Sequence, residues 1–189
     1  LLKMTIGIET GSDRLRQIIG KWGTVSQAME ALDKLANRKF LVLTSFIIGF
    51  PFEQESEMDL TIRFALKLIM KGRNFRFPQF YNFTPVAGSP VSDLLQKIGY
   101  QFPKRLEEWE HVDWDHNLFF KDNPTRRERL EAIAFISKFI DRKTDDYGSK
   151  AFVSTLYSTY RPVAFLRLAL KFYRFMPERT LYHFLKKLV

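Results

Sequence analysis

Short apolar segments alternate with stretches of helical spacing over the first hundred residues. Residues 4–9 are mostly apolar and end at a Thr-Gly-Ser turn, which predicts a buried strand that leads into a turn. Residues 40–49 form a nearly continuous apolar run, so we expect a second strand that is buried on both faces, as in parallel sheets. A third strand is expected within 75–84, before a connection rich in proline and glycine.

Helical spacing separates these predicted strands. The first helix is expected to place four apolar residues on one face: Leu15, Ile18, Ile19 and Trp22. A second helix should start at Thr24, whose spacing to Gln27 is that of a capping box, and Ser56 should cap a third. This alternation predicts βαβ units and an α/β fold with a parallel sheet, either a barrel or an open doubly wound sheet.

The pattern changes after about residue 100, where no strong strand is visible. Thr125 and Glu128 have the spacing of another capping box, which predicts a helix. The net charge of the chain is +9, and residues 150–189 carry +7 of it, with eight basic side chains and one acidic. No run of about 18 uncharged apolar residues occurs, so no ordinary membrane-spanning helix is expected.

The basic tail, residues 150–189, has three readings. Arg167, Lys171 and Arg174 share one helical stripe beside apolar residues, and the pattern repeats over 181–188. The tail could pack its apolar face on the preceding domain, lie on an anionic membrane surface, or contact nucleic-acid phosphates.

Composition excludes several classes of chemistry. A hydrophobic content of 46% in 189 residues supports a sizeable core and excludes a mainly disordered chain. The absence of cysteine excludes disulfides, thiolate zinc sites, a cysteine nucleophile and iron–sulfur ligation by this chain. Residues 111–116 hold two histidines and two aspartates, but no regular spacing would make them converge, so no metal site is expected.

The ends of the three predicted strands carry the candidate ligand-binding residues. Ligands of parallel α/β folds bind at the carboxyl ends of the strands. Glu9 closes the first strand, where it could accept hydrogen bonds from a ribose or face the next helix; a solvated turn acid is the alternative. Gly49 permits close backbone approach to a flat ligand and Pro51 fixes the turn, unless this is an ordinary loop.

Three segments at these strand ends resemble a known family. They read GIETGS at 7–12, FIIGFPFEQ at 46–54 and NFTPVAGSP at 82–90. Together they are similar to strands four to six of the radical S-adenosylmethionine (SAM) core, particularly the branch that carries a cobalamin-binding domain. The resemblance implies that residues 1–100 form the C-terminal half of a partial (β/α)6 TIM-like barrel. Residues 101–149 would then be a connecting helical region, and 150–189 a basic amphipathic α-helical extension.

The resemblance also implies a cofactor-binding set and a reaction. The acid of the first strand would contact the ribose or the amino-acid end of SAM. Residues of the second strand would flank the adenine and shape the turn, and those of the third would close the adenine side. The set is Glu9, Ile47, Gly49, Pro51, Thr84 and Pro85. In such enzymes a 4Fe-4S cluster cleaves SAM reductively to a 5′-deoxyadenosyl radical that abstracts hydrogen from the substrate, and the protein positions the cofactors.

Two departures from the family pattern modify this expectation. Phe52-Glu53-Gln54 replaces the usual Gly-Glu-Thr, and the cluster-binding CxxxCxxC is absent. We therefore expect a fragment that lacks the cluster ligands and is inactive alone, taken from an enzyme of radical C–H chemistry such as cobalamin-dependent methylation or rearrangement. A degenerate, non-catalytic homologue is the alternative, as is an α/β module with a membrane- or nucleic-acid-binding tail.

The expected substrate is a small or lipid-like molecule, and the expected location is the cytoplasm, with membrane association through 150–189 as an option. Glu9 stands where tRNA-modifying methylthiotransferases usually have glutamine, which favours another branch.

Overall fold

A parallel four-stranded sheet with helices is the centre of the fold. The computed structural model describes residues 2–77, 79–111, 119–120, 123–141 and 151–180. The strands are β1 (Lys3–Glu9), β2 (Leu41–Ile48), β3 (Phe75–Arg76) and β4 (Phe80–Asn82). The helices are α1 (Asp13–Ile18), α2 (Val25–Leu35), α3 (Glu55–Lys71), α4 (Ser92–Lys97), the 3₁₀ helix η1 (Leu106–His111), α5 (Pro124–Ser137) and α6 (Ala151–Ala169). The predicted α/β class and the change to helices after residue 100 are confirmed for the described residues.

All strand pairs in the sheet are parallel. Strand β1 pairs with β2 from Lys3 opposite Leu41 onwards, and β3 and β4 both pair with β2. The single third strand predicted over 75–84 is therefore wrong, because two short strands occupy it. The segment between them contains a proline, a residue without an N–H to donate to a ladder. After this break, the Phe80 amide donates to Ser137 Oγ of α5 at 2.8 Å, which anchors β4 to that helix.

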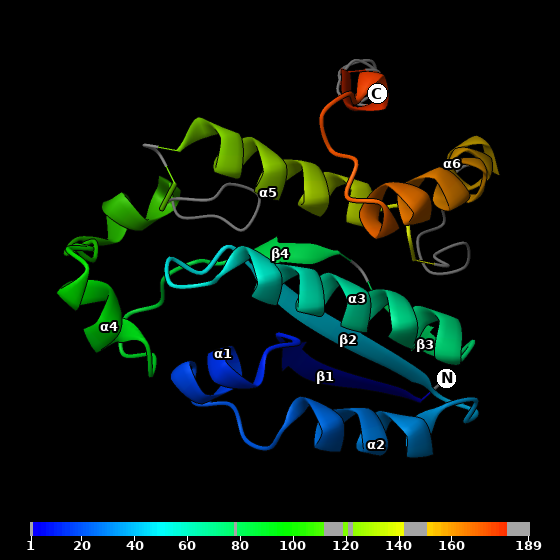
Figure 1. The fold of residues 1–189 in the computed structure, drawn as a ribbon, viewed down its shortest axis with the longest axis horizontal. Coiled ribbons are helices and arrows are strands. Elements are labelled where there is room, and N and C mark those ends of the chain that lie inside the picture. Colours follow the sequence, from blue (N-terminus) through cyan, green and yellow to red (C-terminus); the bar gives the residue numbers. More distant parts are fainter. Residues whose placement is uncertain (1, 78, 112–118, 121–122, 142–150, 181–189) are drawn as a thin grey trace.

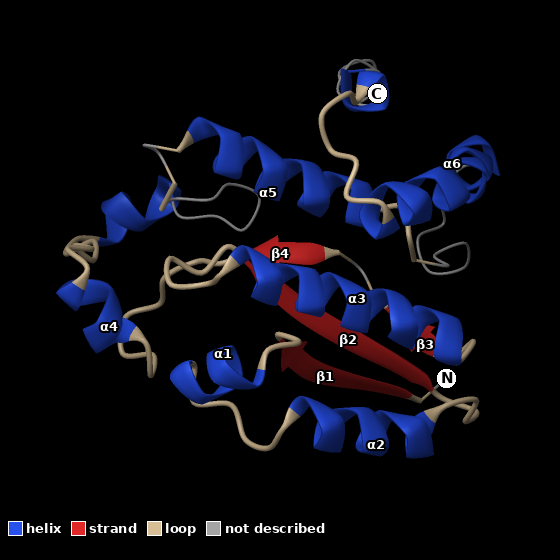
Figure 2. Ribbon diagram, viewed as in Figure 1, coloured by secondary structure: helices blue, strands red, loops and turns tan. Residues whose placement is uncertain are grey.

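Among the described residues, helices cover one face of the sheet and leave the other uncovered. Figures 1 and 2 show α2 running along β1, α3 along β2 and α5 beside β4. Along β2, Val42, Phe46 and other even-numbered residues are buried, whereas the odd-numbered residues are only half-buried. The prediction that this strand is buried on both faces is thus wrong. Its second face borders the pocket described below, which side chains do not fill.

Aromatic rings fill the centre of the covered face. The Phe46 ring meets those of Phe64, Phe77 and Phe80 edge-on, with centroids 5.4–6.0 Å apart. Such edge-to-face contacts add to the hydrophobic stabilisation of the buried rings. Because β2, α3 and β4 all contribute rings, this cluster fixes the strand ends relative to one another.

Helix starts agree with the sequence in one case and differ in two, and the first helix is shorter than expected. The capping box of Thr24 and Gln27 is confirmed. Gln54, rather than Ser56, is the N-cap of α3, and Asn123, rather than Thr125, is the N-cap of α5. Pro124 takes the first helical position of α5, where its missing N–H costs nothing. Helix α1 ends at Ile18, which leaves Trp22 outside it and 93% exposed.

The basic stripe expected in the tail is interrupted. Helix α6 ends at Ala169, and Lys171 has a positive φ of 57°, so Arg174 does not continue the helical face of Arg167. Arg167 pairs with Glu178 at 3.1 Å, and Lys171 pairs with Asp59 of α3. The repeat expected over 181–188 lies outside the described residues. In the part of the chain that the structure describes, none of the helices has the length and hydropathy to cross a membrane.

Candidate functional site

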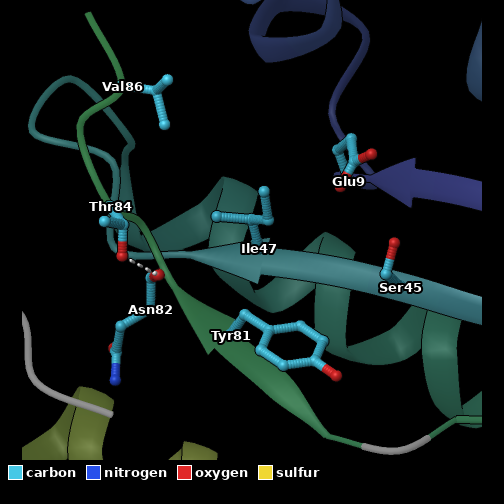
Figure 3. A pocket seen from close by; sticks show the side chains of 7 residues that line it. All are labelled: Glu9, Ser45, Ile47, Tyr81, Asn82, Thr84 and Val86. Carbon is cyan, nitrogen blue, oxygen red and sulfur yellow. Dashed lines mark hydrogen bonds between the residues drawn. The ribbon is translucent and has the colours of Figure 1, made fainter. Parts of the chain in front are cut away.

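The carboxyl ends of β1, β2 and β4 surround a pocket of about 390 Å³ (Figure 3). This volume falls within the usual range for small-ligand sites. Seven residues line it: Glu9, Ser45, Ile47, Tyr81, Asn82, Thr84 and Val86. In Figure 3, Ile47 stands on β2 between the end of β1, with Glu9, and the end of β4, with Thr84. The lining is mostly apolar, with a carboxylate on one side and hydroxyl groups elsewhere.

Three of the six residues expected to bind the cofactor line this pocket: Glu9, Ile47 and Thr84. Gly49, Pro51 and Pro85 are not among its lining residues and belong to the adjoining loops. Sequence reasoning missed the other four lining residues, Ser45, Tyr81, Asn82 and Val86. The strand period could have identified Ser45, because it lies two residues before Ile47 and therefore on the same face of β2.

Glu9 reaches the pocket through a local distortion of β1. It has a left-handed backbone, with φ of 67°, and the register with β2 shifts between Gly7 and Glu9. The carboxylate folds back over Gly7, where a Cβ atom would overlap Glu9 Oε1. Lys21 Nζ lies 3.5 Å from the same oxygen. A non-glycine residue in this conformation is strained, and such strain is concentrated at functional sites.

The loop after Glu9 is held against helix α3. Thr10 Oγ1 lies 3.1 Å from Thr61 Oγ1, and the Gly11 amide donates to the same hydroxyl at 3.0 Å. A Cβ atom at Gly11 would lie 2.7 Å from the carbonyl oxygen of Leu60. Glycine is therefore required here so that the loop can approach the helix backbone. This contact fixes the position of the end of β1, where Glu9 lies.

The loop after β2 encloses a buried carboxyl group. Glu53 is 3% exposed, and its Oε2 accepts a hydrogen bond from the Gly49 amide at 2.5 Å. Gly49 has φ of 80°, a conformation that glycine adopts readily. Burial raises the pKa of Glu53 to about 8, against the opposing effects of the backbone hydrogen bond from Gly49 and the charge of Arg126. The carboxyl group is therefore largely protonated at pH 7.

Aromatic packing takes the place of the glycine that the family pattern has at position 52. The Phe52 ring lies against Phe50, with centroids 5.7 Å apart, and Phe50 in turn packs on Phe83 at 4.5 Å. The Phe83 amide donates to the Ile48 carbonyl at 2.8 Å, which joins the ends of β2 and β4. The side chain of Phe52 thus supports the loop by burial against the neighbouring strand end.

These residues suit an adenosine-like ligand and do not suit an iron–sulfur cluster. An apolar strip at Ile47 and Val86 can contact a flat ring, and Glu9 can accept hydrogen bonds from hydroxyl groups of a sugar. Thiolates are absent because the chain has no cysteine. Among the residues described, no group of three or more His, Asp or Glu side chains could hold a metal ion. Of the segment 111–116 with its two histidines and two aspartates, only His111, the last residue of η1, lies within the described residues.

A parallel sheet with a ligand pocket at the carboxyl ends of its strands is the arrangement of barrel-type α/β enzymes. The family model of the radical SAM superfamily matches residues 1–65, which include β1, β2 and the start of α3. Residues 1–65 are thus similar to the radical SAM superfamily, and the parallel sheet with its helices is consistent with a partial TIM-like radical SAM fold.

Several curated proteins are similar to the chain. An uncharacterized methyltransferase of Pyrococcus horikoshii is 28% identical over 148 residues, 78% of this chain and 27% of that protein. A threonylcarbamoyladenosine tRNA methylthiotransferase of Thermotoga maritima is 28% identical over 149 residues, 77% of this chain and 33% of its own length. A tRNA-2-methylthio-N(6)-dimethylallyladenosine synthase of Buchnera aphidicola is 27% identical over 100 residues, 52% of this chain and 22% of that protein. The chain thus spans a third or less of the curated relatives it matches.

Proposed function

We propose that residues 1–100 of the chain form the C-terminal, SAM-binding half of the core of a radical SAM enzyme. The observation that supports this most directly is Glu9, which a strained bulge turns into the pocket at the end of β1. Glu9 would accept hydrogen bonds from the ribose or amino-acid end of SAM, and Ile47, Gly49 and Pro51 would flank the adenine. Thr84 and Pro85 would close the adenine side.

The cofactors of the proposed enzyme are SAM and a 4Fe-4S cluster, which supplies the electron for reductive cleavage of SAM. This chain contributes no cluster ligand, because it contains no cysteine. Its own residues bind and orient the adenosine part.

The proposed parent reaction is radical methylation or rearrangement, with cobalamin as a further cofactor. The similarity to a protein named as a methyltransferase supports methyl transfer. Methylthiolation of tRNA is a second candidate, since similarity to a tRNA methylthiotransferase extends over 77% of the chain. Glu9 in place of glutamine favours the first. Product analysis of the full-length enzyme with a small-molecule or lipid-like acceptor and with tRNA separates the two.

Calorimetric titration with SAM tests the binding function of this chain. We expect the wild-type chain to bind SAM and Glu9→Gln to bind about tenfold more weakly, because a charged acceptor is replaced by a neutral one. Glu30→Gln is a matched control, since Glu30 is exposed on α2 and remote from the pocket. Absence of binding, or equal affinity of wild type and Glu9→Gln, would contradict the proposal.

We make a separate proposal for the function of the tail, residues 150–189. Peripheral contact with an anionic membrane would use its excess of basic side chains, and nucleic acid is the lesser alternative. Lys171 and Arg179 pair with Asp59 and Glu131 of the preceding part of the chain, which supports packing on the domain instead. Co-sedimentation with vesicles of phosphatidylserine and phosphatidylcholine tests membrane contact, and a chain that stays in the supernatant argues against it.

A further inference from the structure

One carboxylate, that of Glu57 in the first turn of α3, accepts four hydrogen bonds. Its Oε1 accepts from Ser12 Oγ at 2.6 Å and from Arg14 Nε at 2.9 Å. Its Oε2 accepts from Arg14 Nη2 at 2.6 Å and from the Gln54 amide at 2.9 Å. Glu57 is 6% exposed, so its carboxylate is largely shielded from water, whereas the Arg14 side chain that pairs with it is 46% exposed. Each acceptor position of the carboxylate is thus occupied by a hydrogen-bond donor of the protein.

The partners of Glu57 belong to both loops of the candidate site. Ser12 ends the loop that follows Glu9 and is the N-cap of α1. Gln54 ends the loop that follows Gly49 and is the N-cap of α3. Arg14 adds a further link, because its Nη2 also donates to the Phe52 carbonyl at 2.9 Å. The two loops are therefore joined through one side chain, although they are about forty residues apart in sequence.

The charge of Glu57 is fixed by this environment. Hydrogen bonding from Arg14, with contributions from Ser12 and Gln54, lowers the pKa of Glu57 to about 2 in spite of the opposing effect of burial. The group is ionised throughout the neutral range and holds no proton to transfer. Its contribution is that of an anion which accepts hydrogen bonds and pairs with a guanidinium, an arrangement that combines strength with defined geometry.

We propose that Glu57 is a positioning residue that couples the two ligand-bearing loops, so that Glu9 and the Gly49 loop meet the ligand as one preorganised unit. This inference rests on the proposed function, because it assumes that SAM binds at both loops. Preorganisation lowers the ordering cost of binding, so loss of the coupling should weaken SAM binding without removing any residue that lines the pocket.

Hydrogen exchange of the full chain, followed by mass spectrometry and combined with SAM titration, tests the coupling. The amides of Gly11 and Gly49 are suitable reporters, because they donate to Thr61 and Glu53 rather than to Glu57. In Glu57→Gln, we expect both reporters to exchange about tenfold faster and SAM affinity to fall about tenfold, the size expected for loss of a charged hydrogen bond.

Two further variants make the test specific. Asp59→Asn removes a carboxylate from the same helix, one that pairs with Arg129 and Lys171, and should leave both reporters and SAM affinity unchanged. Ser12→Ala removes only the hydrogen bond from the first loop to Glu57, so amide exchange should become faster at Gly11 and not at Gly49.

The outcomes separate this inference from the proposed function. Faster exchange at a single loop in Glu57→Gln, or equal changes in Asp59→Asn, would overturn the coupling. Faster exchange at both loops with unchanged SAM affinity would overturn the positioning role. A wild-type chain that binds no SAM would overturn the proposed function and the positioning role with it. If exchange at both loops still rose together in Glu57→Gln of such a chain, Glu57 would be a purely structural link between the loops.

Discussion

The buried acid Glu53 should make the stability of this protein decrease as the pH rises, and Glu53→Gln should remove that decrease. Glu53 Oε2 accepts a hydrogen bond from the Gly49 amide, while Oε1 is buried and has no hydrogen-bond partner among the described residues. A glutamine has nearly the same shape, and its amide oxygen can accept the same hydrogen bond. Its amide is neutral at every pH, so the substitution removes only the cost of ionising a buried group.

The magnitude follows from the difference between the folded and unfolded pKa. Burial raises the pKa of Glu53 from 4.5 to about 8. Below pH 4.5 both states hold the proton, and no penalty arises. Between pH 4.5 and 8 only the unfolded state releases it, so the free energy of unfolding falls by about 1.4 kcal/mol for each pH unit. The cost is about 3 kcal/mol at pH 7 and levels off near 5 kcal/mol above pH 8.

Urea unfolding at pH 5, 6, 7 and 8 measures this effect. The quantity to follow is the difference in unfolding free energy between Glu53→Gln and wild type, because the other titrating groups cancel in it. We expect this difference to grow by about 3 kcal/mol in favour of the variant between pH 5 and 7. Glu30→Gln, on the exposed face of α2, should show a constant difference. A difference for Glu53→Gln that stays constant with pH would refute the reasoning.

Three further substitutions test the loops and their support. Gly7→Ala should displace the carboxylate of Glu9 and weaken SAM binding in calorimetry about tenfold, with little loss of stability, because the new Cβ meets only a side-chain end. Gly11→Ala meets the backbone of α3 instead and should lower the unfolding free energy by about 2 kcal/mol in urea titration; unchanged stability would contradict the close approach. Asn74→Ala removes bonds to Leu35, Asn37 and Phe40 and should cost about 3 kcal/mol by thermal unfolding, against less than 1 kcal/mol if water replaces them.

The strand ends could be predicted from sequence because each combines a local pattern with a local constraint. An apolar run that stops at Thr10-Gly11 identifies the end of β1, and Gly49 follows β2 in the same way. Pocket residues on the strand itself, such as Ser45, follow from the period of two once the exposed face is known. The exposed face could not be deduced, because an apolar run such as that of β2 looks the same whether or not its second face is covered.

The remaining errors arose where tertiary contacts decide between local alternatives. Ser56 and Thr125 are both residue types suited to capping, yet the N-cap of α3 is Gln54, two residues before Ser56. There Glu57 completes the capping box and also accepts a hydrogen bond from Ser12. The basic stripe of the tail required a continuous helix, which ends before Lys171. The ion pair between Lys171 and Asp59 of α3 joins residues more than a hundred positions apart, so no local sequence pattern could predict it.

Two acids near the start of α3 have opposite protonation, Glu53 in the loop before the helix and Glu57 in its first turn, and this pair leads to a further prediction. Burial keeps Glu53 neutral near pH 7, while Arg14 keeps Glu57 ionised. The charge of Glu57 also raises the pKa of Glu53, but it is the smallest of the causes, after burial and the hydrogen bond from Gly49. Glu57→Gln should therefore loosen the loops and leave the pKa of Glu53 only slightly lower. Carboxyl titration of Glu53 by NMR with ¹³C-labelled glutamate measures this, and a return of its pKa to the ordinary value would show that repulsion, rather than burial, holds the proton.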